Sequence, residues 1–158
     1  MITCEMMGRL CNQMFIAATA HSLAIDNNDE VLFPYAISGI TPTDKETVLH
    51  RNTVFRNLNY AKDLSFVQQV WLEPSDQSYG KIEYKNRTIL RGYFQSEKYF
   101  AHNRQQILDL FRIQQQALDF LDHKYSEIIN NKKYVSVHIR RGDYLKYTDF
   151  HAIMGKEY

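Results

Sequence analysis

Hydrophobic residues in the first part of the chain fall into short runs separated by polar turns. Residues 1–7 and 30–34 are apolar enough to form strands, and the stretch 12–26 between them leaves a helix little polar face. This order of strand, turn, buried helix and strand is the repeating unit of α/β folds. Gly8 marks the first turn, and Asn12 has a side chain suited to cap the helix that follows it.

Three later segments carry the pattern of β-strands. Residues 64–72 and 88–93 are rich in β-branched and aromatic side chains, which favour strands. In residues 134–139, every second position is Val or Ile and the positions between are polar or aromatic. This period of two predicts a strand with one face more buried than the other.

The remaining segments are expected to be helical or irregular. A helical region should begin within residues 97–104, and apolar residues recur at helical spacing from 105 to 130. A break near Gln114 divides that stretch into two amphipathic helices. The segment 38–59 is polar and turn-rich, so it is expected to lack regular structure, and 130–133 is the turn before the last strand.

Composition excludes several classes of protein. The chain has 19 basic and 18 acidic residues and a net charge of +1, which opposes a nucleic-acid binder. It has no apolar run of about 18 residues and no basic-then-apolar start, so no transmembrane helix or signal peptide is expected. Cys4 and Cys11 are its two cysteines, too few for a disulfide framework, and a reducing cytosol is the expected compartment.

The aromatic residues fit two different roles, and the histidines give no sign of a metal site. The 11 tyrosines and 9 phenylalanines suit either a sugar-stacking surface or core packing. The histidines are scattered, without the carboxylate or cysteine spacing of metal ligands, so neither a metal site nor a cofactor is expected. His21 lies in the apolar helix and is interpreted as a core histidine.

The strongest chemical signal is the segment His138-Ile-Arg-Arg-Gly-Asp143, which follows directly on the last predicted strand. A guanidinium group matches phosphate oxygens in a two-pronged geometry and stays charged at any working pH. Ligands of open α/β sheets lie beyond the carboxyl ends of the strands. The segment therefore indicates a site for an anion such as a diphosphate, although an arginine pair on a solvated surface gives the same pattern.

This segment resembles the His-x-Arg-Arg-x-Asp motif of the α-1,2- and α-1,6-fucosyltransferases. Residues 8–15, Gly-Arg-Leu-Cys-Asn-Gln-Met-Phe, are similar to a motif of the bacterial α-1,2-fucosyltransferases of glycosyltransferase family 11. Residues 90–100 resemble a second block of that branch, Gly-Tyr-x-Gln-Ser-x-x-Tyr-Phe, and 54–58 are a weaker echo. The order and spacing of these segments also fit the family, so the resemblance covers the whole chain.

The resemblance implies an α/β fold, namely the N-terminal Rossmann-like half of a GT-B glycosyltransferase plus the first strand of the second domain. The expected domains are 1–132, an N-terminal α/β domain, and 133–158, the incomplete start of the nucleotide-sugar-binding domain. Family members continue with further strand–helix units after the arginine strand. We therefore expect this chain to be truncated at its C-terminus, either as part of a working enzyme or as an inactive remnant.

The function implied by the resemblance is transfer of L-fucose from GDP-fucose to the 2-hydroxyl of a galactoside in surface polysaccharide synthesis. The expected partners are that donor and a galactoside-containing glycan acceptor, with no nucleic acid. The family's first arginine of the pair holds the β-phosphate, so Arg140 is the expected diphosphate clamp. The enzyme should lie in the cytoplasm, or peripherally at the inner membrane.

Further site residues are carried over from the same motifs. His138 and Arg141 would support the phosphates or the ribose, and Asp143 would orient an arginine or lock the loop through a salt bridge. In distant relatives the residues matching Arg9 and Asn12 face the donor. Cys11 replaces a family glycine, and it would cost about 1 kcal/mol or more if that position required a positive φ.

The block containing Tyr93, Gln95, Ser96 and Tyr99 has two interpretations. These residues would either line the acceptor side of the cleft, or end a strand and begin a helix. The second, structural interpretation is slightly favoured by the residue types alone.

Overall fold

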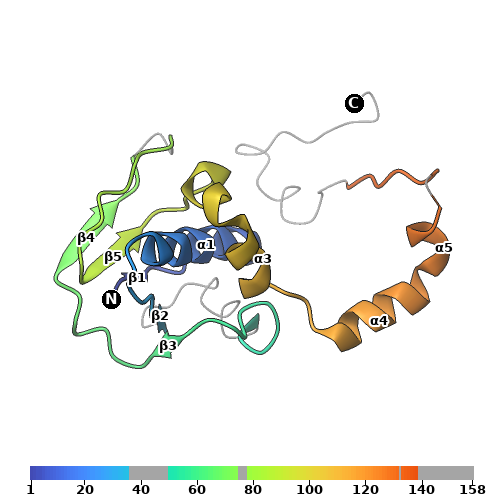
Figure 1. Ribbon diagram of the computed structural model, residues 1–158, viewed down its shortest axis with the longest axis horizontal. Coiled ribbons are helices and arrows are strands. Elements are labelled where there is room, and N and C mark those ends of the chain that lie inside the picture. The colour runs from blue at the N-terminus through green and yellow to red at the C-terminus, as the bar shows by residue number, and fades with distance from the viewer. Residues whose placement is uncertain (36–49, 75–77, 132, 139–158) are drawn as a thin grey trace, which may run out of the picture. The chain divides into compact units, whose positions relative to one another are not determined.

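The computed structural model describes residues 1–35, 50–74, 78–131 and 133–138 (Figure 1). The chain divides into two compact units, Met1–Gln115 and Gln116–Tyr158, which are described separately. The domain boundary predicted between residues 132 and 133 stays a prediction.

The first unit contains short parallel strands. They are β1 (Thr3–Cys4), β2 (Phe33–Pro34), β3 (Tyr60–Ala61), β4 (Gln69–Leu72) and β5 (Thr88–Arg91). One sheet has the order β1-β5-β4 and the other pairs β2 with β3, with every described pairing parallel. An isolated parallel bridge between Ile2 and Val31 places the segment leading into β2 beside β1. The predicted α/β class is confirmed at this level, as a mixed fold with small parallel sheets.

Helix α1 (Leu10–Asp26) is the central packing element of the first unit. It contacts β1, the 3₁₀ helix η1 (Glu97–Tyr99) and helix α3 (Arg104–Leu110) (Figure 1). Its middle is built of small residues such as Ala17 and Ala20, both fully buried, which allow close approach of neighbouring elements. The buried helix predicted from its lack of a polar face is confirmed.

The helical region after β5 is also confirmed. The 3₁₀ helix η2 (Ala101–Asn103) leads from η1 into α3, and residues 111–114 separate α3 from α4 (Gln115–Lys124), where the break was predicted. Buried Asn103 fastens this region to α1, because its side-chain amide donates to Ser22 Oγ at 3.0 Å and to Asp26 Oδ1 at 2.7 Å.

One strand prediction in the first unit needs correction. The strand predicted over 64–72 is limited to β4, because residues 65 and 66 form a turn in which the Asp63 carboxylate accepts from Ser65. In the segment 38–59, predicted to be irregular, residues 51–57 form turns and 58 a bend, whereas His50 is helical; 38–49 lie outside the described residues.

The second unit contains the rest of α4 and the short helix α5 (Ser126–Ile129). The strand predicted from residue 134 is wrong for residues 134–138, which have no regular structure and leave Val135 85% exposed. An alternating pattern becomes a strand only when its backbone groups pair with a neighbour, and no described segment pairs with these residues.

The position of the sheet core can be tested with two leucines of adjacent strands. Leu90 on β5 is 0% exposed, whereas Leu72 on β4 is 61% exposed. Leu90→Ala should lower the free energy of unfolding by about 2–5 kcal/mol, and Leu72→Ala by about 0.5 kcal/mol or less. Urea denaturation followed by circular dichroism measures both, and equal losses would contradict this assignment of the core.

Candidate functional site

The carboxyl ends of β1, β5 and β4 meet at one edge of their sheet, because the three strands are parallel. After β1 the chain passes through α1 to the segment that leads into β2, which lies beside β1 on one side. Strand β5 lies on the other side of β1, so the direction in which strands are added to the sheet changes at β1. Such a reversal of direction separates the loops at the carboxyl edge and is where open α/β sheets bind ligands. The loops after β1 and β5 are therefore the first place to look for a site.

The loop after β1 turns at Gly8, which has φ +71°, and a Cβ at this position would collide with the side chain of Asn12. The fully buried Gln13 holds the loop, since its Nε2 donates to the Gly8 carbonyl at 2.9 Å. Helix α1 begins immediately afterwards, with the exposed Arg9 as its N-cap residue. Its first turn contains no acidic residue, so the positive end of the helix dipole is not neutralised there.

The predicted helix cap at Asn12 is wrong. The turn at Gly8 starts the helix at Leu10, so Asn12 lies within its first turn and no side chain caps the helix. The Asn12 side chain instead accepts a hydrogen bond from Gln95 Nε2 at 2.9 Å. This bond joins the first turn of α1, which follows the Gly8 loop, to the loop after β5. It therefore connects the motif at residues 8–15 with the block at residues 90–100.

The loop after β5 is held in place by Glu73, at the end of β4. The two carboxylate oxygens of Glu73 accept from the backbone N–H groups of Tyr93 at 2.6 Å and Phe94 at 2.9 Å. Phe94 has φ +51°, and a Cβ at Gly92 would collide with the Glu73 side chain. Sequence reasoning missed Glu73, since a single carboxylate after a strand carries no signal of the loop that it will bind.

Two residues of the same block have structural roles. Ser96 caps η1, its Oγ accepting from Lys98 N–H at 3.4 Å, and the Tyr99 hydroxyl accepts from Gly80 N–H at 3.1 Å. Burial raises the pKa of Tyr99 above its usual value. These contacts agree with the structural interpretation of the block, while Gln95 is exposed at the edge of the sheet.

Cys11 does not carry the strain that its replacement of a glycine could have caused. It lies inside α1, not in the left-handed region of φ, and its side chain is exposed. The conditional cost attached to a positive φ therefore does not apply to this position.

The arginine segment is described only in part. His138 is exposed in the second unit, and Arg140, Arg141 and Asp143 lie outside the described residues. The structure therefore brings together Asn12 and the loop of Gln95, with Arg9 beside Asn12 on the same turn, and the remaining predicted site residues stay predictions.

Comparison with known proteins gives a match to the model of glycosyl transferase family 11 over residues 1–155. The chain belongs to glycosyl transferase family 11. The family expected from the sequence motifs is therefore confirmed.

Two relatives come from Escherichia coli. The chain is 34% identical over 84 residues to the O-antigen biosynthesis glycosyltransferase WbnK, covering 49% of this chain and 28% of that protein. It is 25% identical over 174 residues to an alpha-1,2-colitosyltransferase, covering 98% of this chain and 59% of that protein. The chain thus spans less than two thirds of the length of either relative. No solved structure matches it significantly.

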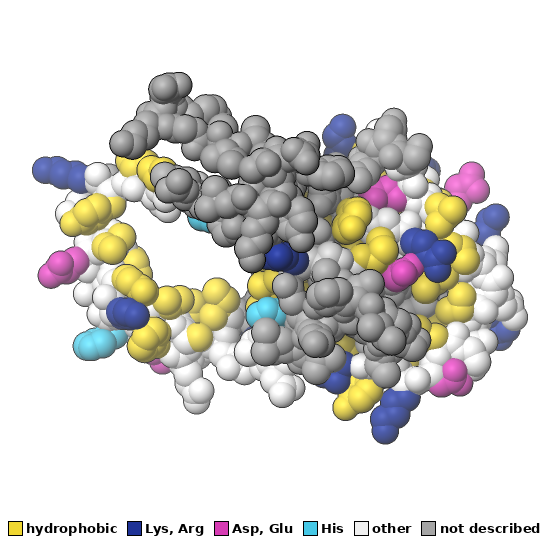
Figure 2. Space-filling view, turned by 180° about the vertical axis from the view of Figure 1, so that it is seen from behind, with side chains coloured by type: hydrophobic (Ala, Val, Ile, Leu, Met, Phe, Trp, Pro, Cys, Tyr) yellow, Lys and Arg dark blue, Asp and Glu magenta, His cyan; other side chains and the backbone are white. Residues whose placement is uncertain are grey.

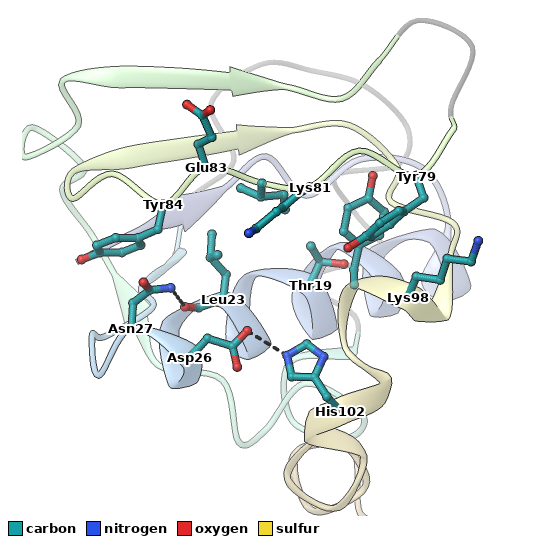
Figure 3. A pocket seen from close by; sticks show the side chains of 12 residues that line it. Thr19, Leu23, Asp26, Asn27, Tyr79, Lys81, Glu83, Tyr84, Lys98 and His102 are labelled. Carbon is teal, nitrogen blue, oxygen red and sulfur yellow. Dashed lines mark hydrogen bonds and ion pairs between the residues drawn. The ribbon is translucent and has the colours of Figure 1, made fainter.

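A pocket of about 540 Å³ in this family 11 chain lies along the flank of α1 (Figure 3). One wall is formed by α1 from Thr19 to its end at Asp26, together with Asn27. The opposite wall is the segment 79–84, which leads toward β5. Lys98, Tyr99 and His102 complete the lining, and His102 Nε2 lies 2.8 Å from Asp26 Oδ2. Sequence reasoning missed this pocket, because its walls are close only in the folded chain.

Metal and membrane signals are absent from the part of the chain that the structure describes. No cluster of three or more His, Cys, Asp or Glu side chains there could hold a metal ion. None of its helices is both long enough and apolar enough to cross a bilayer. His21 is half-buried on α1, in agreement with its interpretation as a core residue, and burial lowers the pKa of its ring.

The role of Glu73 can be tested by Glu73→Gln. A glutamine offers one acceptor and one N–H₂ group where two backbone donors converge, so one of these N–H groups loses its partner. The free energy of unfolding should fall by about 1–3 kcal/mol, and the Tyr93 or Phe94 amide should exchange with deuterium faster. Glu97→Gln, at an exposed position of η1, is the control; unchanged exchange in Glu73→Gln would refute the clamp.

The half-buried ring of His21 predicts a pH dependence of stability. Its pKa is lowered in the folded protein, so below about pH 6.5 the unfolded chain binds more protons. The free energy of unfolding should therefore fall as the pH drops through this range. His21→Gln should flatten the profile measured by urea denaturation between about pH 5 and 8, whereas His123→Gln, on an exposed part of α4, should not.

Proposed function

We propose that this chain is part of a glycosyltransferase that transfers L-fucose from GDP-fucose to the 2-hydroxyl of a galactoside in O-antigen synthesis. The observation that carries the proposal is the hydrogen bond between Asn12 and Gln95 at the carboxyl edge of the sheet. It unites two motifs of a family 11 chain at the place where an α/β sheet binds ligands. One relative is named an O-antigen biosynthesis glycosyltransferase, which supports the proposed role in O-antigen synthesis.

The donor would be held from two sides. Arg140 is proposed as the catalytic residue, clamping the diphosphate and stabilising the negative charge that grows on it as GDP leaves. His138 and Arg141 would contact the phosphates or ribose, and Asp143 would orient an arginine. Arg9 and Asn12 would face the donor from the first turn of α1, where the unneutralised helix dipole favours an anion.

The reaction would be a single displacement at the anomeric carbon. The acceptor oxygen forms the new bond to this carbon, the bond to the diphosphate breaks, and the configuration inverts. The hydroxyl proton passes to a base. Glu73 is a poor candidate for that base, because both of its carboxylate oxygens already accept backbone hydrogen bonds. Arginine side chains can balance the diphosphate charge without a metal.

We further propose the GT-B arrangement for the whole enzyme. Residues 1–132 would form the Rossmann-like first domain and 133–158 the start of the nucleotide-sugar-binding domain. The enzyme would act in the cytoplasm or peripherally at the inner membrane, where a glycan acceptor would be presented.

A second candidate donor is a colitose-bearing nucleotide. The relative that aligns over 98% of this chain is named an alpha-1,2-colitosyltransferase. Both candidates would be nucleotide-sugars, and the arginines are proposed to hold a diphosphate in either case.

Donor binding can be tested with GDP by isothermal titration calorimetry on the 158-residue chain. Truncating a guanidinium that hydrogen-bonds a phosphate should cost about 1.5–3 kcal/mol, so Arg140→Ala should weaken GDP binding by roughly tenfold or more. Arg104→Ala, an exposed arginine on α3 outside the motif, is the matched control. GDP binding that is insensitive to Arg140→Ala, or no GDP binding at all, would count against the proposal; GDP-fucose can then be compared with GDP as a competitor.

A further inference from the structure

We propose that the pocket beside α1 binds a neutral oligosaccharide, namely the part of the acceptor glycan that precedes the reacting sugar. This inference rests on the proposed function, since it assumes that the enzyme's acceptor is a glycan. The pocket does not include Arg9, Asn12 or Gln95. Of the block formed by Tyr93, Gln95, Ser96 and Tyr99, Tyr99 alone lines it.

The aromatic lining suits the faces of sugar rings. Tyr79 and Tyr99 pair with their ring centroids 4.9 Å apart, and Tyr79 remains 46% exposed. Tyr84 lies at the other end of the same wall, where its hydroxyl donates to Asp29 at 2.9 Å (Figure 3). Tyrosine combines an apolar ring with a polar tip, and a pocket of such rings with a few polar groups is typical of small-ligand sites.

The polar groups of the pocket are held in position before any ligand arrives. The Asp26 carboxylate receives the Asn103 amide on one oxygen and the His102 ring nitrogen on the other, at 2.7 Å and 2.8 Å. Both partners come from the η2 segment, so the carboxylate is fixed from one side, and each oxygen retains lone pairs for a ligand hydroxyl.

A buried threonine also lines the pocket. Thr19 is 1% exposed and points from α1 into the pocket (Figure 3), and its Oγ1 has no hydrogen-bond partner among the described residues. A buried polar atom without a partner costs free energy. Because this oxygen is closed off from the open space of the pocket, a ligand hydroxyl would reach it only if a neighbouring side chain of the wall moved.

The charges indicate a neutral ligand. Asp26 and Glu83 contribute two carboxylates, and Lys81 and Lys98 contribute two ammonium groups. Figure 3 shows the Asp26 carboxylate and the Lys81 ammonium group turned toward the pocket, whereas the Glu83 carboxylate and the Lys98 ammonium group point away from its middle. A phosphate site would need a surplus of positive charge, whereas a neutral sugar can donate to the Asp26 carboxylate and accept from the Lys81 ammonium group.

The position of the pocket fits an extended acceptor. Along α1, Thr19 lies about 10 Å and Asp26 about 21 Å beyond Asn12, given the rise per residue of a helix. On the other side, the segment that begins with Gln95 continues directly into Lys98 and Tyr99. The pocket therefore starts close to the proposed transfer site and leads away from it, as the preceding sugars of a polysaccharide would.

The test uses the full 158-residue chain and a panel of neutral galactose-containing di- to pentasaccharides, with galactose as the monosaccharide probe. Saturation-transfer NMR and calorimetry measure binding. The longer glycans should bind more tightly than galactose, and Tyr79→Ala should weaken them by about threefold to tenfold. Tyr35→Ala is the matched control, because Tyr35 is 44% exposed and lies outside the pocket. His102→Ala should also weaken the longer glycans.

Failure of this inference can be told from failure of the proposed function. If GDP binds through Arg140 but no glycan binds, or Tyr79→Ala and His102→Ala bind the glycans like the unmodified chain, the pocket assignment is wrong while the donor proposal stands. If the glycans bind through Tyr79 and GDP does not bind, the pocket assignment stands and the proposed donor chemistry fails.

Discussion

The parallel pairing of β1 with β5 is the constraint on which the rest of the first unit depends. It aligns Thr3 with Ile89 and Cys4 with Leu90, residues far apart in the sequence. Because the two strands run in the same direction, the loops that follow them emerge at one edge of the sheet. Without this pairing, the Gly8 loop and the Gln95 loop would have no reason to meet, and the bond between Asn12 and Gln95 could not form.

The two loops reach their shapes by different means. The first depends on a glycine that tolerates a positive φ and on the buried amide of Gln13, both local in the sequence. The second depends on Glu73, which directly follows the neighbouring strand β4. Its carboxylate takes the place of water as the acceptor for two backbone N–H groups of the loop. Phe94 can hold a positive φ because its ring is buried beside Trp71 and Tyr99 and because this carboxylate fixes its backbone. A rigid loop at the edge of the sheet is the kind of support that a binding site requires.

The face of α1 that looks away from the sheet edge has a separate organisation. Asn103 and His102 converge on Ser22 and Asp26, so one polar cluster both docks α3 onto α1 and shapes the wall of the pocket. Figure 2 shows apolar side chains in yellow on the second unit. The exposed apolar residues of this unit include Phe120, Ile128 and Ile129.

The sequence by itself determined the elements whose causes are local. The apolar, small-residue stretch makes α1 buried, Gly8 makes the turn, and the interrupted helical spacing separates α3 from α4. Its motifs also determined the family, because they are written directly in residues 8–15, 90–100 and 138–143. These features depend on residues only a few positions away in the sequence, so the sequence alone is enough to predict them.

Only the tertiary structure decided which partner each polar group found. Asn12 could cap a helix or bind a distant side chain, and the early start of α1 decided for the second. Glu73 became a clamp because β4 ends beside the β5 loop, and Cys11 is unstrained because it lies inside a helix. The alternation in residues 134–138 was not enough to make a strand, since strand formation is a property of two paired segments and not of one.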